Sequence, residues 1–225
     1  MNSENIKNLC NQYYDRIVEL RHYFHAYPEL DYEEVQTARI VADELKKMGI
    51  ETIEGVAKTG VVGIIRGKYP GKTVLLRADM DALPIQEEAD VPYKSLIPGK
   101  MHACGHDGHI ASLIGTAMIL NELKDQLHGN VKLVFQPAEE FDGGALPMIE
   151  EGVLENPHVD AAFACHLWGP VPKGKVCIKY GPAMAAPDKF SFKIIGKGGH
   201  GSMPHLCVDA VMISVEAINY MQTII

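Results

Sequence analysis

Three histidines and one cysteine lie within eight residues, the segment His102-Ala103-Cys104-Gly105-His106-Asp107-Gly108-His109. Packing alone does not account for so many histidines in so short a run. A thiolate and an imidazole suit zinc, and they suit manganese, cobalt and nickel with weaker preference. A structural zinc site needs four such ligands, often in Cys-x-x-Cys pairs, and the sequence has no such pair. The segment therefore favours an open, catalytic metal site, and the alternative is a histidine-rich helix cap.

Cys104 and His106 flank Gly105 at the predicted start of a helix that runs to about Lys124. The positive end of a helix lowers the pKa of a nearby thiol and so favours the thiolate that a metal binds. We therefore expect a lowered pKa for Cys104. His109 lies further along the same helix, and we expect it to support the site or to pack against it rather than to bind metal.

Paired carboxylates follow two of the predicted strands. Asp79 and Asp81 leave one strand two residues apart, so in an extended chain their side chains point to the same side. Glu139 and Glu140 follow another strand and are adjacent, so they face different directions. One of these two glutamates can bind metal while the other holds a proton near the bound water. The alternatives are a solvated loop for the first pair and an ordinary surface pair for the second.

His166 is a single histidine directly after the predicted strand Ala161–Cys165. A histidine in this place is more often a hydrogen-bonded polar residue than a metal ligand. The other three clusters also lie at strand ends or in the following loops, however, and open α/β sheets bind their ligands there. His166 is therefore a further candidate ligand.

The order of the predicted elements indicates an α/β fold. Apolar residues at helical spacing predict helices over about 6–27, 33–48, 105–124, 146–154 and from 208 onward. Short β-branched or apolar runs predict strands at 61–65, 73–78, 131–135, 161–165, 175–180 and 189–195. Buried strands that alternate with helices imply a sheet covered on both faces. The glycine- and proline-containing segment 181–187 interrupts this order and indicates a linker.

Composition narrows the class of protein. With 225 residues, a net charge of −8 and 47% hydrophobic residues, the chain can form one sizeable core, or one domain and part of a second. The acidic balance argues against nucleic acid as a partner. No apolar run approaches the roughly 20 residues of a membrane helix, and the polar first residues show no signal peptide. Five widely spaced cysteines indicate reduced thiols, so we expect a cytoplasmic protein.

Together these segments resemble the amidohydrolase branch of the aminoacylase–carboxypeptidase metallopeptidase family. Hippurate hydrolases, indole-acetyl-amino-acid hydrolases and N-acetyl-diaminopimelate deacetylases belong to that branch. Any one segment could match by chance, whereas their joint presence in this order is highly specific. The matching segments span nearly the whole chain: Pro28–Leu30, Arg77–Pro84, His102–Asp107, Gln136–Glu140, His166–Trp168 and Gly196–Ser202.

The resemblance implies a role for each candidate residue. Glu139 would be the general base, and Asp81 would orient a group at the metal site. His200 would be the lid-domain histidine that reaches the active site of the partner in a homodimer and stabilises the oxyanion. Two divalent metal ions, manganese or zinc ahead of cobalt or nickel, would be held by four side chains that we expect to converge: Cys104, His106, Glu140 and His166.

The resemblance also implies a fold and an activity. The fold would be a mixed sheet sandwiched by helices, with residues 1–187 in the catalytic domain and residues 188–225 in the start of an α+β lid. The last metal-binding histidine of the family lies in a C-terminal segment that this sequence lacks, so we expect a truncated chain. The implied activity is hydrolysis of the amide bond of small-molecule N-acyl amino acids. The alternatives are an inactive metal-binding or dimerising fragment, and a dipeptidase.

Overall fold

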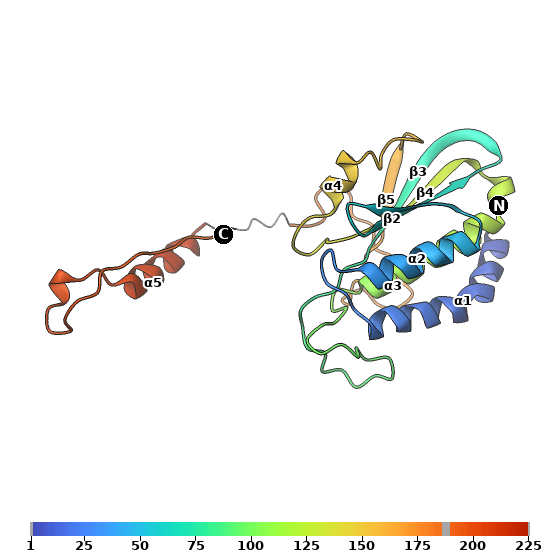
Figure 1. Cartoon of the computed structure of the whole chain (residues 1–225). Coiled ribbons are helices and arrows are strands. Elements are labelled where there is room, and N and C mark those ends of the chain that lie inside the picture. The colour runs from blue at the N-terminus through green and yellow to red at the C-terminus, as the bar shows by residue number, and fades with distance from the viewer. Residues whose placement is uncertain (1, 186–189, 225) are drawn as a thin grey trace. The chain divides into compact units, whose positions relative to one another are not determined.

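The computed structural model describes residues 2–185 and 190–224, which fall into two compact units, Met1–Pro170 and Val171–Ile225 (Figure 1). The predicted boundary between a catalytic domain, 1–187, and a lid, 188–225, falls within residues 186–189, outside the described residues. That domain division stays a prediction.

The first unit is built on one sheet of five strands, in the order β1-β2-β4-β3-β5. The strands are β1 (Glu51–Val56), β2 (Gly60–Arg66), β3 (Tyr69–Asp79), β4 (His128–Gln136) and β5 (Ala161–Ala164). Strand β3 lies between β4 and β5 and is parallel to both, whereas β2 runs antiparallel to β1 and β4. The carboxyl ends of β3, β4 and β5 therefore meet at one edge, where such sheets bind ligands.

Helices cover both faces of this sheet. Three long helices lie on one face, and a short helix, α4, lies on the other (Figure 1). The mixed sheet sandwiched by helices, predicted from the sequence, is therefore confirmed. The helices of this unit are α1 (Ser3–Ala26), α2 (Val35–Lys47), α3 (His106–Glu122) and α4 (Ala145–Glu150), with a 3-10 turn, η1 (Lys124–Gln126), before β4.

Strand β2 shows how the sequence fills both faces. Val61 and Ile65 belong to the core beneath the long helices, and Val62 and Ile64 belong to a second core that contains Met148 of α4. Successive side chains of a strand point to opposite faces, so a strand buried on both sides is a continuous apolar run. By contrast, the edge strand β1 is polar and mostly exposed, and the sequence analysis therefore missed it.

Two of the predicted strands are wrong. Residues 175–180 form no strand, and neither do residues 190–195, the described part of the predicted strand 189–195. A strand needs backbone hydrogen bonds to a neighbouring strand. In the described part of the second unit, such pairing is limited to one isolated bridge between Lys197 and Val208. The helix predicted from 208 is confirmed as α5 (Ala210–Met221), after a 3-10 turn, η2 (Pro204–Leu206).

Helix α5 begins with a side-chain cap. Asp209 Oδ1 accepts hydrogen bonds from the backbone amides of Val211 and Met212, which satisfies two of the free donors of the first turn. None of the helices in residues 2–185 and 190–224 combines the length and the apolar character needed to cross a membrane.

Candidate metal centre

The four sequence clusters gather at the carboxyl edge of the parallel strands. Asp79 ends β3, the Gln136–Glu140 segment leaves the end of β4, and His166 follows β5 by two residues. His106 is the first residue of α3, which packs against β3. The topology of the sheet therefore delivers ligand-type side chains from three strands and one helix to one place.

Cys104 and His166 form one side of this cluster. The Cys104 sulfur lies 3.4 Å from His166 Nε2, and both ligand atoms lie within 4.8 Å of a nitrogen of His106. His166 Nδ1 donates to the carbonyl oxygen of Leu167 at 2.6 Å. In that tautomer Nε2 carries the lone pair, and it faces the thiol.

His106 and Glu140 form the other side. His106 Nδ1 donates to the carbonyl oxygen of Asp81 at 2.8 Å, so in the neutral ring the lone pair is on Nε2. That Nε2 lies 3.8 Å from Glu140 Oε1 and 3.9 Å from Glu139 Oε2. Both His106 Nε2 and Glu140 Oε1 are buried without a hydrogen-bond partner in the described part of the chain.

These orphaned atoms fit a divalent metal. A buried polar atom without a partner costs free energy, and a separation of 3.8 Å is too long for a hydrogen bond between His106 and Glu140. Two ligands that each lie about 2.0–2.2 Å from one zinc ion are roughly 3–4 Å apart. The thiol, imidazole and carboxylate groups are also the donor types that zinc and its neighbours accept.

The electrostatics of the cluster overturn one expectation. Burial, together with the charges of Glu140 and Glu139, raises the pKa of the Cys104 thiol to about 12, so the predicted lowering is wrong for the metal-free chain. The helix end does not decide the pKa, because burial of the thiol and the carboxylates of the β4 loop act in the opposite direction. A bound divalent cation reverses this balance, since a coordinating thiol is deprotonated outright.

Asp81 connects both halves of the cluster without needing to bind a metal. Its carbonyl oxygen accepts from His106, and its Oδ2 accepts from the backbone amide of Glu140 at 2.9 Å. The neighbouring His106 ring, ahead of Asp31 and the backbone amides of Glu139 and Glu140, lowers the pKa of the Asp81 carboxyl despite its burial. The carboxylate therefore stays charged, and Asp81 orients two candidate ligands at once, His106 through its carbonyl oxygen and Glu140 through its carboxylate, the arrangement that commonly supports metal-binding histidines.

Asp79 and His109 support the His166 side. His109 Nδ1 hydrogen-bonds Asp79 Oδ1, and His109 Nε2 accepts from the backbone amide of Leu167 at 2.8 Å. Arg77 Nη1 lies 2.7 Å from the other oxygen of Asp79. Both ring nitrogens of His109 are engaged in these hydrogen bonds, and its supporting role stays a prediction. The sequence analysis gave Asp79 no role, although its two-residue spacing from Asp81 was the signal.

The side chain of Glu139 is accessible to solvent and also lies beside the candidate metal ligands, so it can act there as a proton acceptor. Its side chain is 41% exposed, whereas those of His106 and Glu140 are 1% and 19% exposed. Partial burial, followed by the charges of Asp79 and Glu140, raises the pKa of Glu139. A carboxyl group with a raised pKa is a better general base near neutral pH than an ordinary surface glutamate.

His200 lies in the other compact unit. It is exposed, and its Nδ1 is 2.8 Å from the hydroxyl of Ser202. Its predicted part in the chemistry stays a prediction.

A buried ionic network below the cluster was missed from the sequence. Asp107 accepts from His25 Nδ1 at 2.9 Å and from Arg21 Nε at 3.1 Å, and His25 Nε2 lies 3.1 Å from Glu87. The network ties the first turn of α3, and so His106, to α1. Asp107 was visible as an acidic residue at a helix start, but nothing in the spacing of His25 or Glu87 indicated a contact over 82 and 62 positions.

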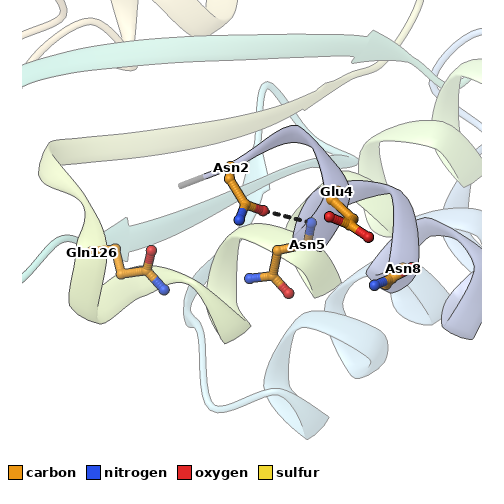
Figure 2. A pocket seen from close by; sticks show the side chains of 5 residues that line it. All are labelled: Asn2, Glu4, Asn5, Asn8 and Gln126. Atoms are coloured by element: carbon orange, nitrogen blue, oxygen red, sulfur yellow. Dashed lines mark hydrogen bonds between the residues drawn. The ribbon is translucent and has the colours of Figure 1, made fainter.

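A separate hollow of about 580 Å³ lies outside the candidate metal centre, and it is lined by Asn2, Glu4, Asn5, Asn8 and Gln126 (Figure 2). Gln126 precedes β4, so this hollow lies at the opposite end of that strand from the Gln136–Glu140 segment. Its walls are mostly amides, and Asn2 Oδ1 is used to accept from the backbone amide of Asn5. It offers neither a metal-ligand set nor an acid–base pair.

Comparison with known proteins agrees with this chemistry. Residues 75–222 match peptidase family M20/M25/M40. The chain is 46% identical over its whole length to an N-acyl-L-amino acid amidohydrolase of Geobacillus stearothermophilus, of which it covers 60%. It is 49% identical over 96% of its length to thermostable carboxypeptidase 1 of Saccharolobus solfataricus, of which it covers 55%.

A solved structure shares the fold. The YXEP protein of Bacillus subtilis, described as a dinuclear metal binding peptidase, is 42% identical with a TM-score of 0.73, over 76% of this chain and 48% of that one. The chain thus spans about half to three fifths of the length of these relatives. The resemblance inferred from the motifs is confirmed, and the chain belongs to peptidase family M20/M25/M40.

Proposed function

We propose that this chain carries the metal centre of an amidohydrolase that cleaves N-acyl amino acids to a carboxylic acid and an amino acid. The observation that carries the proposal is the pair of buried, partnerless ligand atoms, His106 Nε2 and Glu140 Oε1, beside the Cys104–His166 pair. The identity to an N-acyl-L-amino acid amidohydrolase supports the choice of substrate.

Four side chains would hold two divalent ions, with manganese or zinc ahead of cobalt or nickel. Asp81 would fix the direction of His106 through its carbonyl oxygen and of Glu140 through its carboxylate. Such ions, when bound, lower the pKa of a water molecule and polarise the amide carbonyl. The four proposed ligands are Cys104, His106, Glu140 and His166.

Glu139 would move the proton. Its carboxylate takes a proton from the attacking water and later delivers it to the nitrogen of the leaving amine. Water is thereby added across the amide bond: the acyl carbon gains the oxygen, and the nitrogen gains a hydrogen. The raised pKa of Glu139 favours both halves of this exchange near neutral pH. In a homodimer, His200 of the partner subunit would offset the charge on the carbonyl oxygen.

Two other functions stay open. A peptidase that acts on free peptides is favoured by the 49% identity to a carboxypeptidase, since the same centre hydrolyses either amide. The second is a protein that binds metal or dimerises without turnover.

One set of measurements separates the three functions. The purified protein is loaded with manganese or zinc and given N-acetyl-, N-benzoyl- and indole-acetyl-amino acids beside unblocked dipeptides, with Glu139→Gln as the matched control. Turnover of the blocked substrates that disappears in the control supports the proposal. Preference for unblocked dipeptides indicates the peptidase, and metal binding without turnover of either class indicates the third function.

A further inference from the structure

In the loop between α1 and α2, one glutamate occupies the N-cap position of α2 while a different glutamate makes the capping hydrogen bonds. Glu34 occupies the N-cap position of α2, yet its side chain makes no capping hydrogen bond. Glu29 caps the helix instead, because its two carboxylate oxygens accept from the backbone amides of Gln36 at 3.1 Å and Thr37 at 2.7 Å. The side chain of Glu34 is thereby free to turn into the protein.

Glu34 is fully buried, and it reaches the loop that carries the general base. Its Oε1 accepts from the backbone amide of Ala138 at 2.9 Å, and its Oε2 accepts from the hydroxyl of Thr59 at 2.7 Å. Burial raises the pKa of Glu34, and the two donated hydrogen bonds oppose that shift. A buried carboxylate is costly to desolvate, and the hydrogen bonds from Ala138 and Thr59 offset that cost.

Ala138 shows what that carboxylate holds in place. Its φ is +49°, in the left-handed region that a residue with a Cβ rarely adopts. The peptide is held on both sides, since its N–H donates to Glu34 and its carbonyl oxygen accepts from the amide of Gly144 at 2.8 Å. Glu139 follows directly, so the direction in which its side chain leaves the loop depends on this turn.

Resting on the function proposed above, we propose that Glu34 is a positioning residue for the general base. Its buried carboxylate fixes the amide of Ala138, and with it the left-handed turn that aims Glu139 at the substrate, whereas the amide of Glu140 is held separately by Asp81. Glu34 itself touches neither, and acts only through the backbone.

Two further contacts from the same loop strengthen this assignment. The carbonyl oxygen of Glu29 accepts from the amide of Ala82 at 2.8 Å, next to Asp81. Asp31 Oδ2 accepts from the amide of Asp142 at 3.1 Å, on the far side of the glutamate pair. The α1–α2 loop therefore contacts the backbone of both acidic loops of the site.

Hydrogen exchange tests the placement without any substrate or metal. In Glu34→Leu the amide of Ala138 loses a charged acceptor, and its exchange should accelerate by about 10- to 100-fold. Glu34→Gln keeps an oxygen that can accept from the amide of Ala138, and its own amide group can donate to Thr59. The exchange rate of the Ala138 amide in this variant should therefore stay near that of the parent protein. Glu44→Leu is the matched control, because Glu44 is a buried carboxylate of α2 whose partners in the described residues are the side chains of Arg16 and Lys47. Should Glu34→Leu fail to fold, Glu34→Asp keeps the charge but shortens its reach, and the same acceleration is expected.

Kinetics test the positioning role. Glu34→Leu should lower kcat on an N-acyl amino acid by about 10²-fold, the cost of misplacing a catalytic group, with KM and metal content unchanged. In a Glu139→Gln background the same substitution should add little, because there is no base left to aim. An equal loss in both backgrounds, or a Glu34→Gln protein as impaired as Glu34→Leu, overturns the proposal. If no N-acyl amino acid is turned over, the proposed function fails by itself, and the exchange of Ala138 still decides whether Glu34 holds the turn.

Discussion

Lys132 is a lysine buried inside the sheet, and its replacement by methionine gives a sharp test of the physical reasoning. It lies in β4 with 2% of its surface exposed. Its Nζ donates to the carbonyl oxygens of Val153 at 2.8 Å, Glu155 at 2.7 Å and Pro157 at 3.0 Å. One ammonium group thus binds three backbone carbonyl groups of the turn between α4 and β5. Burial lowers the pKa of this ammonium group.

The expected loss follows from which of those oxygens water can reach. Glu155 is exposed and Pro157 is half-buried, so their carbonyl oxygens can bind water once the ammonium is gone. Val153 is buried, and an unsatisfied buried carbonyl costs about 1–3 kcal/mol. Methionine fills most of the volume and removes the cost of burying a charge, which limits the loss. We therefore expect Lys132→Met to lower the free energy of unfolding by about 1–3 kcal/mol.

Urea unfolding followed by circular dichroism measures this change, with an unchanged m-value as the sign that the folded state is intact. Lys72→Met is the control, because Lys72 is exposed and a surface substitution changes stability by less than about 0.5 kcal/mol. A Lys132→Met protein as stable as the parent, or more stable, refutes the reasoning. Desolvation of the ammonium would then outweigh its three hydrogen bonds.

Three further predictions concern the site and its support. Glu139→Gln should lower turnover by about 10²–10⁴-fold while metal content measured by elemental analysis stays the same; an unchanged rate would show that Glu139 is not the base. Zinc must displace the proton of Cys104, whose pKa is about 12 in the metal-free chain. Calorimetric titrations should therefore show an affinity for zinc that rises about tenfold per pH unit. They should also show a release of protons on zinc binding, which Cys104→Ser abolishes. The hydrogen bond that His25 donates to Asp107 raises the pKa of His25 above its usual 6.5 despite burial, so the stabilising contribution of this contact is full below pH 6.5 and is lost as the pH rises through the folded value. Urea midpoints across that range should show the loss in the parent protein and not in His25→Gln, and identical slopes in both would contradict the assignment.

The parts of the fold that the sequence predicts are those with a local physical cause. Buried strands such as β2 are continuous apolar runs, and amphipathic helices repeat their apolar residues every three to four positions. The runs at 175–180 and 190–195 have the same appearance but form no strand. Pairing is a property of two segments, and no single run reveals whether it has a neighbour. Lys132 shows the same limit, since its partners come from a turn more than twenty positions away.

The candidate ligands were predictable because the residue type alone determines whether a side chain can bind a metal. Cysteine, histidine and glutamate at strand ends suit a metal wherever the sheet brings those ends together, and the parallel order of β4, β3 and β5 does so. The residues that hold the ligands in place were not predictable. Glu34 and His25 act on backbone or side chains 104 and 82 positions away, and no spacing rule connects them.

The pKa of Cys104 shows how the two kinds of information combine. The helix start predicts a thiolate, but burial of the thiol, together with Glu140 and Glu139 from another loop, raises its pKa instead. The same crowding raises the pKa of Glu139. Acidic groups that oppose one another in this way are stabilised together by a divalent cation, which favours every deprotonated form at once. The local prediction therefore fails for the metal-free chain, and the reason for its failure is itself an argument that the cluster is built to hold metal.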